Sequence, residues 1–320
     1  MNKMVRQLLP FATLALIVCI LWALKPESFL TAENILNVLS RSSVNGIIAM
    51  GMTAVIISAG IDLSVGSMMA LCGMVGAYVM LAIGGTIPGT GAMFIGSVVA
   101  MAVGSLCGFL NGTLITRLKL PPFIVTLGTM SAFRGISYVM NDGMMYDVPS
   151  YTYLGSGDVL GIPVCVLVCA VIVSAAFFIL RYTRLGRYTY AVGSNREAAF
   201  HAGVNVNLTL VAIYALTGLA VGIAAMIATS RTVSAQPTAG ISLELDIIAS
   251  VVIGGASLSG GRGTVSGTIV GTLLISFLRN GCTLLGISTN IQLIVIGAII
   301  IGAVALDQMA RSRAEAGRAS

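Results

Sequence analysis

Long apolar runs separated by short polar segments make up most of the chain. Helices that cross a bilayer need about 20 mostly apolar residues, and charges are rare inside them. Ten such runs predict an all-α membrane protein, a polytopic bundle of about ten transmembrane helices. The predicted spans cover residues 8–24, 43–60, 65–83, 91–115, 121–140, 163–180, 208–229, 245–258, 264–280 and 289–306.

The composition of the chain supports the same class and excludes others. Of the 320 residues, 57% are hydrophobic and 9% are charged, whereas soluble domains carry roughly 25% charged residues. A soluble enzyme and a disordered chain are both excluded. Ten helices would use roughly 200 residues, so residues 1–320 form a single transmembrane domain without room for a large soluble one. The 38 glycines favour close helix packing.

The basic residues predict the orientation of the chain. If the N-terminus is cytoplasmic, twelve of the 17 lysines and arginines fall in cytoplasmic segments. This bias satisfies the positive-inside rule and predicts that both termini are cytoplasmic. The five basic residues on the outer side are Lys25, Arg41, Arg134, Arg231 and Arg279.

The longest predicted cytoplasmic loop, residues 181–207, contains signals for one short helix. Ser194 and Glu197 fit a capping box, and Gly203 is a natural residue just past a helix end. We therefore predict a helix over residues 195–202, too short to be stable alone. It is either a solvated connector or a docking helix for a cytoplasmic protein.

The sequence excludes an ATP site of the P-loop type in this chain. Its only lysines are Lys3, Lys25 and Lys119, and none follows glycine in the Walker A pattern. Energy for any transport must come from a partner or from an ion gradient. We expect no metal and no cofactor, because the six cysteines lie in or beside apolar runs and His201 is the only histidine.

Asp62 is the main ionisable residue expected within the membrane, where such residues are functional by default. Asp62 or Ser64 can also cap the helix that starts at residue 65. Gly60 and Gly66 on either side let the backbone turn sharply. Both interpretations, a helix cap and a gate or pathway residue, stay open.

Three charged residues lie near the outer ends of predicted spans. Glu244 and Asp246 precede the eighth span and are either first-turn acids of a helix or a docking point for an external binding protein. Arg134 ends the fifth span, where we expect it to extend to the interface.

Hydroxyl and amide side chains within the spans are candidates for a sugar pathway. Each of them is equally suited to a hydrogen bond between helices. These residues are Ser58, Asn111, Thr126, Thr129, Ser131, Asn290 and Gln292.

Several segments carry a resemblance to one family of transporters. Glu197-Ala198-Ala199, three further residues and Gly203 match the EAA---G core of ABC-importer permeases, without the Ile-x-Leu-Pro that often follows it. Residues 60–67, Gly-Ile-Asp-Leu-Ser-Val-Gly-Ser, resemble the hallmark of ribose-type sugar importers. Further ribose-type matches cover residues 123–128, 234–240 and 244–263.

The resemblance spans residues 30–310 and implies an inner-membrane permease subunit of an importer for ribose or a related monosaccharide. It implies three partners: a cytoplasmic ABC ATPase, an extracytoplasmic sugar-binding protein and a second permease copy or homologue. Glu197, Ala198, Ala199 and Gly203 would then couple the permease to the ATPase. Gly60, Asp62, Ser64, Gly66, Asn111, Thr126 and Thr129 are the candidates for the gate and pathway.

Two other classes of protein compete with this interpretation. Tyr146-Asp147 and the Gly-Ser-Gly-Asp at residues 155–158 mimic elements of intramembrane aspartyl proteases. They lie in a Gly/Ser/Pro-rich segment, which turn chemistry explains better. An ion-coupled secondary carrier is the serious alternative, but it would need intramembrane carboxylates or a broken-helix ion site, for which only Asp62 is a candidate.

Overall fold

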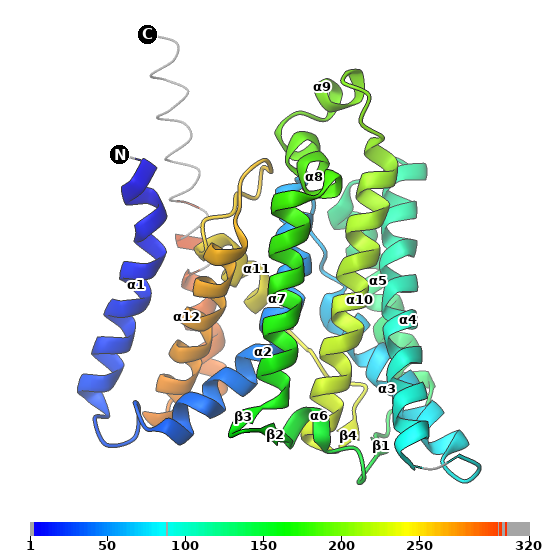
Figure 1. Ribbon diagram of the computed structural model, residues 1–320, viewed down its shortest axis with the longest axis vertical. Coiled ribbons are helices and arrows are strands. Elements are labelled where there is room, and N and C mark those ends of the chain that lie inside the picture. Colours follow the sequence, from blue (N-terminus) through cyan, green and yellow to red (C-terminus); the bar gives the residue numbers. More distant parts are fainter. Residues whose placement is uncertain (1–2, 88, 300, 303–304, 306–320) are drawn as a thin grey trace.

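The computed structural model describes residues 3–87, 89–299, 301–302 and 305, which form a bundle of long helices (Figure 1). Within these described residues, six helices are long and apolar enough to cross a membrane. They are α2 (Ala32–Ile57), α3 (Val65–Ile83), α4 (Gly89–Arg117), α7 (Val164–Tyr182), α10 (Val206–Thr232) and α12 (Val265–Leu284).

Four further helices complete the described part of the bundle. They are α1 (Lys3–Leu24), α5 (Pro122–Val139), α11 (Leu243–Ile253) and an apolar helix over Thr289–Ile299. Each of the ten predicted spans therefore overlaps a helix, and the prediction of a polytopic helical membrane protein is confirmed.

The remaining elements lie at the two ends of the bundle (Figure 1). Strand β1 (Tyr146–Asp147) pairs antiparallel with β4 (Ser234–Ala235), and β2 (Asp158–Val159) pairs antiparallel with β3 (Ile162–Pro163). These strands and helix α6 (Tyr153–Ser156) mark one end, called here the strand end. Helices α8 (Arg184–Ser194) and α9 (Arg196–His201) mark the other, called the α9 end, where α1 also begins.

The boundaries of the second predicted span were wrong. Helix α2 begins at Ala32 rather than residue 43, because Thr31 caps it by accepting a hydrogen bond from the Asn34 backbone N–H at 3.2 Å. The first ten residues of α2 mix polar with apolar side chains and include Glu33 and Arg41, so hydropathy alone did not detect them.

Two further predicted spans differ from the structure or extend beyond it. The eighth ends at Ile253 instead of residue 258, because the chain turns at Gly254 and Gly255. The predicted tenth span begins with the Thr289–Ile299 helix, but residues 300, 303–304 and 306 lie outside the described residues. The basic residues Arg311, Arg313 and Arg318 also lie outside them.

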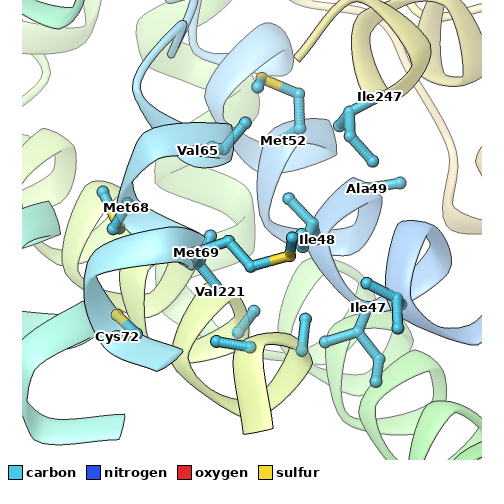
Figure 2. Close-up of a cluster of buried hydrophobic side chains, with 14 of the residues drawn as sticks. Ile47, Ile48, Ala49, Met52, Val65, Met68, Met69, Cys72, Val221 and Ile247 are labelled. Carbon is cyan, nitrogen blue, oxygen red and sulfur yellow. The ribbon is translucent and has the colours of Figure 1, made fainter. Parts of the chain in front are cut away.

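The core of the bundle forms where α2, α3, α10 and α11 meet (Figure 2). Ile47 and Met52 on α2, Met68 on α3 and Ile247 on α11 are each fully buried. Burying a side chain of this size contributes about 1.5–3 kcal/mol in a soluble protein, whereas inside a membrane close packing supplies the attraction between helices.

Glycines bring α4 and α10 into close contact, as the high glycine content predicts. A Cβ atom on Gly104 would lie 2.2 Å from the Gly218 carbonyl oxygen, and one on Gly218 would lie 2.0 Å from the Gly104 carbonyl oxygen. Only residues without a side chain allow this backbone approach.

Candidate coupling and pathway sites

Helix α9 is capped at its start by Asn195, the residue immediately before the helix. The Asn195 Oδ1 atom accepts a hydrogen bond from the Ala198 backbone N–H at 2.9 Å. The predicted capping box starting at Ser194 was wrong, because Ser194 is the last residue of α8, a helix that was not predicted. Glu197 instead lies in the first turn of α9, where a carboxylate interacts favourably with the helix dipole.

The end of α9 is a Schellman motif built on Gly203, which has φ +82°. The Gly203 N–H donates to the Phe200 carbonyl, and the Val204 N–H donates to the Ala199 carbonyl, both at 3.0 Å. Ala199 and Val204 are buried together with Val192 of α8. The predicted role of Gly203 as the residue after the helix end is confirmed.

The capped helix presents one polar and aromatic surface to solvent. Glu197, Ala198 and Gly203 are exposed, whereas Ala199 is buried beneath the helix. Phe200, three residues after Glu197, is 67% exposed. Phe200 was not among the residues predicted from the sequence, although a large apolar residue in an otherwise polar loop was a usable signal.

A groove of about 790 Å³ runs between α9 and the start of α10. Its lining includes both charged and apolar side chains, and an open groove of this kind suits a protein partner better than an enclosed small molecule. Its lining residues are Arg196, Glu197, Phe200, His201, Gly203, Val204, Asn205, Val206 and Asn207.

Helix α8 connects this surface to the bundle. The Tyr190 hydroxyl donates to the Gly263 carbonyl oxygen at 2.9 Å, and the Gly261 N–H donates to the Ile57 carbonyl at 2.8 Å. Burial raises the pKa of the Tyr190 phenol, and the nearby Arg181 guanidinium opposes that shift, so the phenol stays protonated as a donor near neutral pH. A movement of α8 would therefore displace the 254–264 loop, and through it the end of α2.

A buried polar network surrounds the start of α3. Asp62, Ser64 and Asn111 are each fully buried. Asp62 Oδ1 accepts from the Ser64 N–H at 2.9 Å and from the Ser64 hydroxyl at 2.6 Å. Asn111 of α4 donates to the Ser64 hydroxyl at 2.8 Å. Asp62 thus bonds to the residue immediately before α3, while Ser64 itself makes no side-chain capping bond.

The predicted threonines lie beside this network. The Thr126 hydroxyl donates to the Pro122 carbonyl at 2.9 Å and lies 3.4 Å from the Ile61 carbonyl. Thr129 donates to the Thr126 carbonyl at 3.3 Å. The structure therefore brings Asp62, Ser64, Asn111 and Thr126 together, with both hydroxyls and the Asn111 Nδ2 bonded within the bundle. Asp62 Oδ2 and Asn111 Oδ1 are buried and have no hydrogen-bond partner among the described residues.

Gly60 and Gly66 flank the network at points of close contact. A Cβ atom on Gly60 would lie 2.7 Å from the Tyr214 hydroxyl oxygen, and one on Gly66 would lie 2.2 Å from the Gly240 carbonyl oxygen. The start of α3 is therefore packed directly against the 233–242 segment, which connects α10 to α11.

The other predicted polar pathway residues do not join this network. Ser58 bonds to the Val55 carbonyl, and Gln292 bonds to Thr283 and the Ile287 carbonyl. Ser131 and Asn290 are exposed.

The structure defines the surroundings of three charged residues. Asp246 is only 5% exposed, and its carboxylate is paired with the Arg279 guanidinium at 2.8 Å. Asp246 and its half-buried neighbour Glu244 lie in the first turn of α11, as one of the two interpretations predicted, and a docking role for them stays a prediction. Arg134 does not extend to the interface, because its Nη1 donates to the carbonyls of Pro237 and Ala239 at 2.5 and 2.7 Å.

The aspartates that mimic a protease lie outside the long helices. Asp147 belongs to β1 and Asp158 to β2, and the Asp158 carboxylate accepts from the Gly161 N–H at 3.2 Å within a turn. Two catalytic aspartates facing each other from membrane helices are therefore ruled out for this pair.

Comparison with known proteins agrees with a polytopic helical membrane protein. Residues 34–304 match the model of the family described as branched-chain amino acid transport system / permease component. The chain belongs to this family of permease components.

Similar curated proteins share almost the full length of the chain. The ribose import permease protein RbsC of Bacillus subtilis is 44% identical, covering 96% of this chain and 94% of its own. RbsC of Haemophilus influenzae is 43% identical, covering 93% and 91% respectively. The D-allose transport system permease protein AlsC of Escherichia coli is 41% identical, covering 93% and 90%. No solved structure matches the chain.

These findings confirm three predictions about the class of protein. The chain is an ABC-importer permease, it is a transport subunit rather than an ATPase, and it is a multi-pass protein of the inner membrane. An ion-coupled secondary carrier, the alternative on composition alone, is excluded by membership of this family.

Proposed function

We propose that this chain is the membrane permease of an ATP-driven importer for ribose or a closely related monosaccharide. The names of the relatives support the substrate class, since RbsC proteins import ribose and AlsC transports D-allose. Two permease copies, or this chain and a homologue, would enclose the pathway. An extracytoplasmic binding protein would deliver the sugar and a cytoplasmic ATPase would supply the energy.

The exposed surface of α9 is the observation that carries this proposal. Glu197, Ala198 and Phe200 face solvent on a helix that is fixed at both ends by Asn195 and Gly203. A rigid helix with an aromatic anchor and a charged rim suits docking into a groove of another protein. We assign this surface to the ATPase, as the EAA---G resemblance implies.

The orientation of the permease follows from the same surface. Arg184, Arg187 and Arg196 lie on α8 and α9, and an excess of basic residues marks the cytoplasmic side. The α9 end is then cytoplasmic, the strand end faces outward, and ten spans place both termini in the cytoplasm. The Glu244 side chain remains a candidate contact for the binding protein at the outer half.

The substrate is tested by uptake in cells. A strain without its own ribose permease would express this chain with its cognate ATPase and binding protein, and uptake of labelled ribose would be measured against an excess of unlabelled sugars. We expect ribose, and more weakly allose, to compete. Uptake that none of the monosaccharides reduces would contradict the proposed substrate class.

A second prediction concerns the buried Asp62 carboxylate. Asn accepts the same hydrogen bond from the Ser64 N–H and is as good a capping residue as Asp, so Asp62→Asn should lower uptake by less than about threefold. Asp62→Leu removes the acceptor and should lower it much further. Uptake would be normalised to the amount of permease in the membrane.

A near-complete loss of uptake in Asp62→Asn at normal expression would show that the charge itself matters. Asp62 would then act in the gate or pathway rather than as a local hydrogen-bond acceptor.

A further inference from the structure

The structure contains an open cavity of about 720 Å³ in the half of the bundle near the strand end. It lies between the first half of α2, the end of α10, the start of α11 and the end of α12. We call it the vestibule. Its volume falls in the range of roughly 300–1,000 Å³ that is typical of sites for small molecules.

An ion pair between a buried aspartate and a partly exposed arginine forms part of the vestibule wall. Asp246 and Arg279 both line the cavity, and an Arg279 guanidinium nitrogen lies 2.9 Å from Asp246 Oδ1 and 2.8 Å from Oδ2. The Arg279 Nε atom is buried and has no hydrogen-bond partner among the described residues. Charged groups at membrane depth are costly, and they mark substrate or ion pathways when they persist.

The rest of the lining combines donors, acceptors and small apolar surfaces. Arg41 and Arg231 are exposed, so water can solvate their charges, and Asn45 and Thr289 add an amide and a hydroxyl. Each hydroxyl of a sugar is both a donor and an acceptor, so it matches a wall that offers carboxylate, guanidinium and amide groups together.

The inner boundary of the vestibule is the glycine contact at the start of α3. Gly240 lines the cavity, and its carbonyl oxygen lies 2.2 Å from where a Cβ of Gly66 would stand. Met69 of α3 also lines the cavity. A solute that entered from the strand end would therefore stop at this contact, before it reached the Asp62–Ser64–Asn111 network.

We propose that the vestibule is a weak binding site for a neutral polyol of monosaccharide size, with Asp246 and Arg279 as its hydrogen-bonding residues. The inference rests on the proposed function, since it names where the imported sugar contacts the permease itself. Weak binding fits a conduit, because a solute held tightly would not leave the path.

Protection of a cysteine in the vestibule tests this proposal. Asn45→Cys would be introduced into a permease whose exposed Cys19 is replaced by serine, in right-side-out membrane vesicles that contain no binding protein. Labelling by a membrane-impermeant methanethiosulfonate reagent would be timed with and without ribose. We expect ribose at twice its dissociation constant to slow labelling by about threefold, as mass action requires.

Two controls make the result specific. Leu160, which is 98% exposed and lies between β2 and β3, provides a second site, and Leu160→Cys should be labelled at the same rate with or without ribose. In the Asn45→Cys background, the double change Asp246→Asn with Arg279→Gln removes both charges without leaving one unpaired. This variant should lose the protection while remaining in the membrane.

Three results would overturn the proposal. They are an absence of protection at saturating ribose, protection by gluconate but not by ribose, and a cysteine that is never labelled because lipid or a second permease copy covers the vestibule. If any of these occurs while the complete importer still takes up ribose, the vestibule assignment fails and the proposed function stands. If the complete importer takes up no monosaccharide, the proposed function itself fails.

Discussion

Replacing Gly203 by proline should separate ATP hydrolysis from sugar uptake. Proline cannot adopt the φ of +82° at this position, and it lacks the N–H that donates to the Phe200 carbonyl. A backbone conflict of this kind costs roughly 1–3 kcal/mol. The end of α9 would then lose its fixed geometry, while the membrane helices remain inserted.

We expect uptake by Gly203→Pro to fall by about tenfold or more, since each 1.4 kcal/mol corresponds to a factor of ten. Basal ATP hydrolysis by the ATPase should continue. Gly203→Asn is the matched control, because Asn tolerates the left-handed conformation and should retain most uptake.

Glu197→Arg should lower uptake in the same way as Gly203→Pro, because it reverses the charge of the docking surface. Glu197→Gln, which only removes the charge, should lower uptake less.

Normal uptake by both Gly203→Pro and Glu197→Arg, at unchanged permease levels, would argue against α9 as the coupling surface. Uptake and ATP hydrolysis must be measured in the same membranes, because a lost permease would lower uptake without revealing any change in coupling.

The second large effect is expected from one added methyl group, in Gly66→Ala. Its Cβ would lie 2.2 Å from the Gly240 carbonyl oxygen and 2.8 Å from a Glu244 carboxylate oxygen, so the backbone of α3 or of the 233–242 segment must move. Overpacking of this kind costs about 1–3 kcal/mol. The contact that closes the vestibule on its inner side would be rearranged.

We predict that Gly66→Ala lowers uptake by about tenfold, consistent with an overpacking cost in the lower half of that range. Gly85→Ala adds the same methyl group where nothing lies within 4 Å and should behave as wild type. Full uptake by Gly66→Ala at equal expression would mean that the contact between Gly66 and Gly240 can open without functional consequence.

Hydropathy predicted the helices that are apolar along their whole length. The predicted span 65–83 coincides with α3, Val65–Ile83, and 163–180 differs from α7 by only one or two residues at each end. The start of α2 was missed because it carries several polar residues, of which Asn37, Ser40 and Arg41 line the vestibule. Helix α8 was missed because its arginines and glycines are typical of a loop, although the segment forms an amphipathic helix.

The candidate coupling site was predictable because its signals are local. The segment from Glu197 to Gly203 contains its own start and stop residues, although the cap proved to be Asn195. The pair formed by Asp246 and Arg279 joins residues 33 apart in the chain, and Asn111 bonds to Ser64 across 47 residues. Such contacts depend on how helices pack, which no short motif contains.

We expect this permease to move a monosaccharide by coupling to an ATPase docked on α9. The most direct measurement is sugar uptake into proteoliposomes containing the permease and its ATPase, with loaded binding protein on the side of the strand end and ATP on the side of the α9 end. We predict uptake that requires ATP and the ATPase and is unchanged when ionophores collapse all ion gradients. Uptake that persists without the ATPase, or that ionophores abolish, would contradict this coupling to the ATPase.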